Sequence, residues 1–297
     1  MKLFLRIVVV GALVRWVPVH AAESWIPRLP GLGEGQVAGA SPPAGLYLLN
    51  DLDWTETTLS VGPGAPPATI EIAIDVPVLL WAPGIRMWGA DYTVGVAQPF
   101  DYVSTYGPGL PPVSRANLGT RGGFYETVLI PGQLSWKLSP NAFIKAGIDV
   151  YLPDGNFENP KEMAFPNSIN WWVVEPTLGI SYVPEGWNLS ASLFYDHNFV
   201  NPATHYTSGD VAGGDYTVMK TIGRVGFGVG GYSQTQISDD SYRGLAVVNR
   251  RASNYGVGPI VSYTIGTVSI QATYNRRLAD PRVVSANEFW TEVTLRF

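Results

Sequence analysis

The sequence predicts an all-β protein, an antiparallel transmembrane β-barrel of about 12 strands with short periplasmic turns and long extracellular loops. Three observations lead to this prediction. Apolar and polar residues alternate with the period of a β-strand in many segments, and the connections between these segments are alternately short and long. The chain also has 10 Trp, 15 Tyr and 11 Phe, while only 14% of its residues are charged. Because backbone polar groups in lipid need partners within the protein, a closed barrel suits such a chain.

The first 21 residues are predicted to be a secretory signal peptide that is cleaved. Lys2 and Arg6 give a positive start, residues 7–14 form a short apolar core, and Ala21 is a small residue suited to the cleavage site. The alternative is a membrane anchor, but Arg6 and Arg15 leave too few consecutive apolar residues for a span of about 20. We therefore expect an exported protein of the bacterial outer membrane.

The remaining chain is acidic and has no cysteine. Loss of the signal peptide removes three basic residues and lowers the formal net charge from −5 to −8, so nucleic acid is not an expected partner. Without cysteine, neither a disulfide nor a thiolate metal site is available. Residues 22–43 are rich in Pro and Gly and show no period. They are interpreted either as a periplasmic linker or as a plug of the lumen, and residues 44–297 as the barrel.

The C-terminal strand shows the alternation most clearly. Phe289, Val293 and Phe297 fall on one face, whereas Glu292 and Arg296 fall on the other. The same pattern, followed along the chain, predicts strands near residues 45–56, 68–80, 86–98, 122–137, 140–152, 170–182, 187–199, 214–222, 225–236, 254–264, 267–277 and 287–297.

The connections between these strands support the barrel. Short turns are expected at residues 83–84, 139–140, 184–186, 223 and 265–266, and they alternate strictly with long connections near 57–67, 99–121, 153–169, 200–213, 237–253 and 278–286. In outer-membrane barrels the short turns face the periplasm and the long loops face outside. A soluble β-sandwich would share the alternation of residues, but the export signal, the alternating connections and the terminal Phe297 favour the barrel.

Aromatic residues near the strand ends are expected to form two girdles at the membrane interfaces. The periplasmic girdle is predicted from Trp81, Trp88, Trp136, Tyr182 and Trp187, and the outer girdle from Trp54, Trp171 and Trp172.

If the apolar faces contact lipid, the opposite faces line the lumen and are mostly acidic. Such a lumen favours cations and neutral solutes over anions. Alternatively, the charged groups pair with one another and with water and hold a narrow barrel closed, because about 12 strands lie between the filled and the open kinds of barrel. The charged residues expected on this inner surface are Asp51, Asp53, Glu71, Asp75, Asp91, Lys145, Asp149, Glu175, Asp196, Glu292 and Arg296.

A row of glycines is also expected on the inner surface. Gly226, Gly228 and Gly230 occupy alternate positions of one strand and would leave space there, either for a solute or for an inserted loop. The connection 99–121, which is rich in Pro, is the predicted inserted loop.

Catalysis and metal binding find little support in the residues. After removal of the signal peptide only His197 and His205 remain, and neither has the spacing to a serine that barrel phospholipases carry on a strand. No spaced ligand set for zinc and no phosphate-binding glycine loop is present. The sequence therefore predicts no catalytic residue, no metal and no cofactor.

Four pieces of the second half follow one another in an order and spacing that resemble a known family. They lie at residues 175–179 (EPTLG), 201–210, 231–240 and 256–259 (GVGP), and the first half matches more loosely. Together they resemble the bacterial outer-membrane transporter family named for the meta pathway of phenol degradation. The resemblance implies an outer-membrane barrel that admits hydrophobic or aromatic small molecules, and it brings no set of functional residues.

These features favour a channel for passive uptake of small hydrophobic or aromatic molecules and not an enzyme. A lipase-like barrel hydrolase and a closed structural barrel are the alternatives. The expected partners are outer-membrane lipid and lipopolysaccharide, small hydrophobic solutes, and the barrel-assembly machinery, for which Phe297 at the end of an amphipathic strand resembles a recognition signal.

Overall fold

The computed structural model describes residues 27–59, 68–106, 121–157, 168–247, 251–278 and 286–297. The predicted signal peptide, residues 1–21, lies outside these ranges. Within the described residues no helix is long and apolar enough to cross a membrane.

The wall of the molecule is a single antiparallel sheet that closes on itself through twelve strand positions. Two positions are each made of two shorter strands: β4 (Ala90–Ala97) is continued by β5 (Phe100–Tyr106), and β6 (Arg121–Phe124) by β7 (Val128–Lys137). The other positions are β1 (Gly45–Leu59), β2 (Ala68–Ala82), β8 (Ala142–Tyr151), β9 (Val173–Tyr182), β10 (Trp187–Asn198), β12 (Val211–Ile222), β13 (Val225–Gln236), β16 (Ser253–Ile265), β17 (Val268–Arg277) and β18 (Ala286–Arg296).

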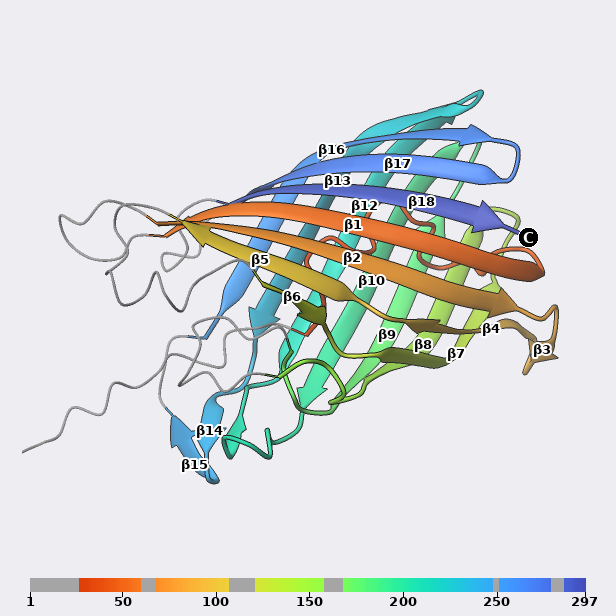
Figure 1. The fold of residues 1–297 in the computed structure, drawn as a ribbon. Helices are drawn as coiled ribbons and strands as arrows, with labels where there is room; N and C mark the ends of the chain where they lie inside the picture. The colour runs from red at the N-terminus through yellow and green to blue at the C-terminus, as the bar shows by residue number, and fades with distance from the viewer. Residues whose placement is uncertain (1–26, 60–67, 107–120, 158–167, 248–250, 279–285) are drawn as a thin grey trace, which may run out of the picture.

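Two pairings close the ring. The last strand, β18, pairs with β1 from Tyr47 opposite Arg296 to Thr57 opposite Ala286. β2 then pairs with both β4 and β5, and β4 pairs with β7, which closes the ring. Closure lets neighbouring strands around the ring satisfy one another's backbone groups, as a membrane requires. The structure confirms the predicted antiparallel barrel, with short connections at one end and long connections at the other (Figure 1).

Small elements extend both ends of the barrel. β3 (Arg86–Met87) pairs with the start of β4 within the turn that follows β2, which makes this turn longer than the sequence predicts. At the end with the long connections, β11 (Tyr206–Thr207), β14 (Asp240–Tyr242) and β15 (Leu245–Val247) form a separate three-stranded sheet.

The ladder of the wall is interrupted between β4 and β5. Pro99 has no N–H to donate, and Gln98 bridges the gap with its side chain: its Nε2 donates to Tyr125 O at 3.2 Å, and its Oε1 accepts from Thr127 Oγ1 at 2.6 Å. Because β5 resumes the wall beyond the gap, the expectation that residues 99–121 insert into the lumen is wrong for 100–106. Residues 107–120 lie outside the described residues.

Most strands turn apolar residues outward and polar residues inward, as predicted. In β18, Phe289 is exposed on the outer surface, whereas Trp290 and Glu288 are buried. Exposed aromatic residues lie on the outer surface near both ends of the strands, among them Trp81, Tyr182, Trp187, Trp54 and Trp172. Trp171 departs from the predicted girdle, because it is buried and its Nε1 donates to Asn198 Oδ1 at 2.8 Å.

β2 is the exception, because its apolar face points inward. Val76 is directly opposite the buried Asp51, and Asp75 is opposite the exposed Leu52. Residues directly opposite each other in a sheet share a face. Ile74 and Val76 are therefore inside the barrel, and Asp75 is outside.

Candidate functional site

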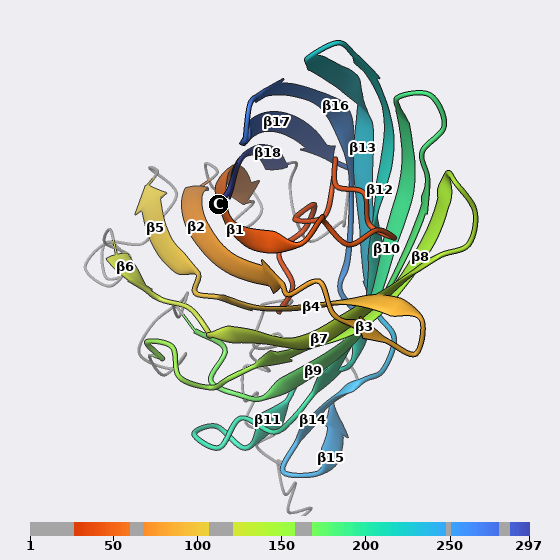
Figure 2. The same ribbon diagram turned by 90° about the vertical axis from the view of Figure 1, so that its right-hand side faces the viewer.

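Residues 27–43, here called the lumen segment, run inside the ring of strands (Figure 2). Backbone groups of the segment hydrogen-bond to polar side chains of the inner wall. The Gly39 amide donates to Ser181 Oγ at 2.8 Å, Asn188 Nδ2 donates to Gly35 O at 2.9 Å, and Gln271 Nε2 donates to Glu34 O at 2.8 Å. These partners lie on β9, β10 and β17, so the described part of the segment is held on several sides of the lumen. Sequence periodicity could not place it, because the segment has no period of its own.

Arg28 is the strongest anchor of the lumen segment. Its Nη1 donates to Glu175 Oε1 on β9 at 2.8 Å, and its Nη2 donates to Asp215 Oδ2 on β12 at 3.1 Å. The guanidinium also lies over the ring of Phe194 on β10, 4.9 Å from the centroid. Both carboxylates are buried, with side-chain exposures of 0% and 1%. Removing one partner of such a buried pair costs about 3–5 kcal/mol, because it leaves a charge without compensation.

Glu34 is a second buried ionisable residue of the lumen segment. Its Oε1 accepts from Asn275 Nδ2 at 2.9 Å. Its Oε2 lies where a side chain at Gly230 would stand, since an added Cβ there would be 2.3 Å away. Gly230 therefore leaves room for Glu34, whereas the atoms nearest to an added Cβ at Gly226 and Gly228 belong to the neighbouring strands β16 and β12 and not to the segment. Burial raises the pKa of Glu34 to about 8, and the nearby carboxylates Asp215 and Glu288 add to this effect.

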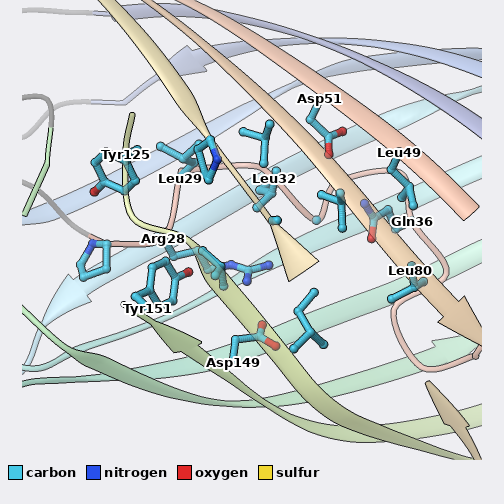
Figure 3. Close-up of a pocket in the computed structure, with 18 of the residues that line it drawn as sticks. Arg28, Leu29, Leu32, Gln36, Leu49, Asp51, Leu80, Tyr125, Asp149 and Tyr151 are labelled. Atoms are coloured by element: carbon cyan, nitrogen blue, oxygen red, sulfur yellow. The ribbon is translucent and has the colours of Figure 1, made fainter. Parts of the chain in front are cut away.

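A cavity of ≈ 170 Å³ remains between the lumen segment and the wall (Figure 3). One side of it is apolar and is formed by Leu29 and Leu32 of the segment together with Val76, Val78, Leu80, Ala97, Val128 and Ile130. The polar lining residues are Arg28, Asp51, Gln133, Lys145, Asp149 and Tyr151, of which Asp51 lies beside Val76 and the last three belong to β8. The cavity is therefore amphipathic, and the inverted face of β2 is the reason for its apolar side.

The structure places most of the predicted lumen residues on the inner surface. Lys145 and Asp149 border the cavity, Glu175 binds Arg28, and Glu292 accepts a hydrogen bond from Gln36 at 3.1 Å. Asp51, Asp53 and Asp196 are buried on inward-facing positions.

Two further predicted residues lie at the end of the barrel with the short turns. Asp91 pairs with Arg86 and is exposed, and Arg296 is exposed and donates to Ala44 O at 3.1 Å.

The prediction for Glu71 and Asp75 was wrong. Both occupy outward positions of β2, opposite Glu56 and Leu52, so they do not line the lumen. Asp75 accepts a hydrogen bond from Asn50 Nδ2 at 2.6 Å, and this pair lies on the outer surface. Alternation separates the two faces of a strand but does not say which face is inside, and β2 breaks the rule that the apolar face meets lipid.

Sequence reasoning missed several charged residues of the inner surface. Asp215 lies on β12. Arg277 of β17 and Glu288 of the neighbouring β18 form an ion pair near Tyr232. Arg28 and Glu34 come from a segment without period. A signal for Asp215 existed in the alternation of Asp215 with Thr217 and Met219, whereas no signal marked Arg28.

The two histidines considered for catalysis have other partners. His197 faces outward, its Nδ1 lies 3.1 Å from Asp210 Oδ1, and its ring packs edge-on against Phe199. His205 lies in the connection before β11, where its amide donates to Asn201 O at 2.8 Å. Among the residues that the structure describes, no group of three or more His, Cys, Asp or Glu could hold a metal ion.

A family model described as "Putative MetA-pathway of phenol degradation" matches residues 50–293. The chain belongs to this family. The resemblance found in the sequence is thereby confirmed, and the match covers most of the barrel. No curated protein sequence matches the chain significantly.

One solved structure supports the barrel architecture. An outer-membrane channel from Pseudomonas putida F1 is similar with a TM-score of 0.68 and 15% identity, over 89% of this chain and 98% of that one. The β-domain of the Bordetella autotransporter BrkA matches with a TM-score of 0.46 and 11% identity, over 86% of this chain and 100% of that one. At these identities the first likeness concerns the fold, and the second is too weak to bear on this chain.

Proposed function

We propose that the protein is an outer-membrane channel that admits small hydrophobic or aromatic molecules by passive diffusion. The cavity in the lumen carries this proposal, because it offers an apolar wall where the interior of a membrane barrel is usually polar. Val76 and Val78 of β2 supply that wall, and Ala97 and Val128 extend it onto the neighbouring strands. A hydrophobic solute gains about 25 cal/mol for each Å² of apolar surface that it removes from water against such a wall.

The size of the cavity supports a small aromatic solute. An apolar cavity of about 150 Å³ is large enough to bind benzene, and this cavity has ≈ 170 Å³. Lys145, Asp149 and Tyr151 of β8 can donate to or accept from a hydroxyl substituent. A solute with an apolar ring and one polar group therefore matches both kinds of lining residue.

In this proposal the lumen segment is a plug. Its contacts with β9, β10 and β17 cross the interior, so a solute passes only when part of the segment moves. The cavity beside it is then a stopping place on the route, and movement of Leu29 and Leu32 opens the way past it.

Uptake by intact cells tests the proposal, because lipopolysaccharide makes the outer membrane the barrier for hydrophobic molecules. Cells that produce the full chain are expected to take up labelled toluene or phenol faster than cells without it. Ala97→Phe places a ring in the cavity and should abolish the gain. Ala73→Phe makes the same change on the outer surface, opposite Trp54, and should leave the gain intact.

Two results would contradict the proposal. Equal uptake with Ala97→Phe and with the unchanged protein would show that the cavity is not on the route. No gain with any form of the protein would favour a closed structural barrel.

Localisation and assembly form part of the same proposal: export by the signal peptide, short turns in the periplasm, and insertion by the barrel-assembly machinery. Phe297 is 72% exposed at the end with the short turns, and its amide donates to Leu46 O at 2.9 Å. Its deletion is expected to leave unassembled protein in the periplasm, measured by cell fractionation and by heat-modifiable mobility on gels. Phe297→Tyr keeps a terminal aromatic residue and is the control, and normal assembly of the deletion variant would argue against this role.

A further inference from the structure

Three neighbouring strands of the inner wall surround the guanidinium of Arg28. β9 contributes the carboxylate of Glu175, β10 the ring of Phe194, and β12 the carboxylate of Asp215. Gly213 lies opposite Phe194 and leaves room for the ring, because an added Cβ there would be 2.5 Å from Phe194 Cζ. We call these three side chains the cation cage. Its members belong to the rigid wall, whereas Arg28 belongs to the lumen segment.

More buried carboxyl groups lie around the cage than one guanidinium pairs with. Asp196 is completely buried beside Glu175, and among the described residues neither of its carboxylate oxygens has a hydrogen-bond partner. Asp215 Oδ1 and Asp149 Oδ1 are also buried without a partner. Buried carboxylate oxygens without donors are unfavourable. The wall at this point therefore offers acceptor oxygens to a cation whether or not Arg28 is present.

The geometry of the cage suits a guanidinium better than an ammonium. Two terminal nitrogens of Arg28 each donate to a different carboxylate, and the central carbon of the group lies 4.9 Å from the centroid of an aromatic ring. A guanidinium has several donors in one plane and stacks on rings, whereas an ammonium is a compact point charge.

We propose that the cation cage is a binding site for solutes that carry a guanidinium group, and that Arg28 is its tethered occupant in this structure. A tethered group has a high effective concentration, so a free guanidinium competes poorly while Arg28 is in place. Once the lumen segment leaves, the site is open to such a solute. This solute class goes beyond the hydrophobic molecules of the proposed channel, and the site exists independently of their passage.

Binding of methylguanidinium to the purified full chain in detergent tests the site. Arg28→Ala is expected to bind methylguanidinium saturably in titration calorimetry, at least about tenfold more tightly than the unchanged protein, which corresponds to about 1.4 kcal/mol. Urea has a similar shape without charge and should not bind. Arg28→Ala combined with Asp215→Asn should lose the binding. Arg28→Ala combined with Glu292→Gln, which changes an inward carboxylate that contacts Gln36 instead, should keep it.

The proposal is overturned if Arg28→Ala binds methylguanidinium no better than the unchanged protein, or binds urea equally well. It is also overturned if Asp215→Asn has no effect in the Arg28→Ala background. Failure of toluene or phenol uptake would leave these binding results unaffected, so the two proposals fail separately.

A second measurement covers the case in which Arg28→Ala does not assemble. The chain has no cysteine, so Ala40→Cys places a single thiol in the lumen segment. Methylguanidinium is expected to raise the rate of thiol labelling in this otherwise unchanged protein and to saturate, because it competes with Arg28 and releases the segment. Urea at the same concentrations should not raise the labelling rate. A labelling rate that stays constant with methylguanidinium would overturn the proposal.

Discussion

The two halves of the inner surface differ in chemistry, and two consecutive residues of the lumen segment, Arg28 and Leu29, each contact one of them. Towards β9, β10 and β12 the surface is charged, and Arg28 binds there to Glu175 and Asp215. Towards β2 and β4 the surface is apolar, and Leu29 packs there against Ile74 and Val76. The charged half holds the segment by directional bonds to fixed partners, whereas the apolar half holds it by the area it buries. The difference teaches that one short stretch of chain can be held in position by its contacts with the charged half, while its looser packing against the apolar half leaves a cavity for a solute.

The largest effect is expected from breaking the charged half. Asp215→Ala removes one partner of Arg28 and the acceptor of the Gly33 amide, so the lumen segment should lose about 3–5 kcal/mol of binding to the wall. Limited proteolysis of the segment in the assembled barrel measures this loss. Asp91→Ala is the matched control, because Arg86 and Asp91 are exposed and such a pair is worth about 0–1 kcal/mol. Equal protease resistance of both variants would mean that the charged half does not hold the segment.

A smaller effect is expected from weakening the apolar half. Leu29→Ala removes a side chain that is 8% exposed and packs on Ile74 and Val76. The loss should be about 2 kcal/mol, at the low end for such a change, because the adjoining cavity already limits the contacts of Leu29. The same protease assay reports the loss. A loss larger than that of Asp215→Ala would reverse the order of the two halves.

The pH dependence of the segment should reflect Glu34. Its pKa of about 8 in the bound segment lies above its ordinary value, because burial beside Asp215 and Glu288 disfavours the charged form. The binding of the lumen segment to the wall is therefore strongest at low pH and weakens as the pH rises through 8. Between pH 7 and pH 9 the loss should be about 1.4 kcal/mol, since one pKa unit corresponds to that amount. Protease resistance should fall over this range and stay constant in Glu34→Gln, and an unchanged fall in that variant would assign it to another group.

The smallest effect is expected on the outer surface, where β2 exposes Asp75 with Asn50. Replacing both residues by Val should raise the unfolding free energy in a bilayer by about 1 kcal/mol, because a polar pair on the lipid side is replaced by apolar groups. Urea titration of the reconstituted barrel measures the change. A loss of stability would mean that the pair contacts protein and not lipid.

The strands were the best predicted part of the molecule. β10 and β13 begin and end within one residue of the predicted bounds, because a strand with one lipid face and one wet face carries a complete period-two pattern. The interruption at Pro99 misled the assignment of the next segment, because Pro in a strand pattern normally marks its end. A side chain bridge such as that of Gln98 leaves no periodic signal.

The candidate site was only partly predictable. Lys145, Asp149 and Glu175 were found because they occupy polar positions of regular strands. The inward face of β2 could not be found, since its apolar residues gain contacts with Leu29 and Leu32 that depend on a segment far away in sequence. Arg28 could not be found for the same reason, because a lone charge in a Pro- and Gly-rich stretch has no period that would tie it to Glu175 and Asp215.

The interruption of the wall at Gln98 and Pro99 makes the pairing of the strands less stable there than in the rest of the barrel. Here the regular ladder stops for two residues: backbone bonds from Gln98 N to Pro77 O and from Tyr125 N to Pro99 O remain, and the side chains of Gln98 and Thr127 add to them. Opening at this place breaks few bonds and leaves the rest of the ladder intact. Amide hydrogens next to the gap should therefore exchange with deuterium by local fluctuation, long before those of β10 and β13 exchange by collapse of the whole cylinder.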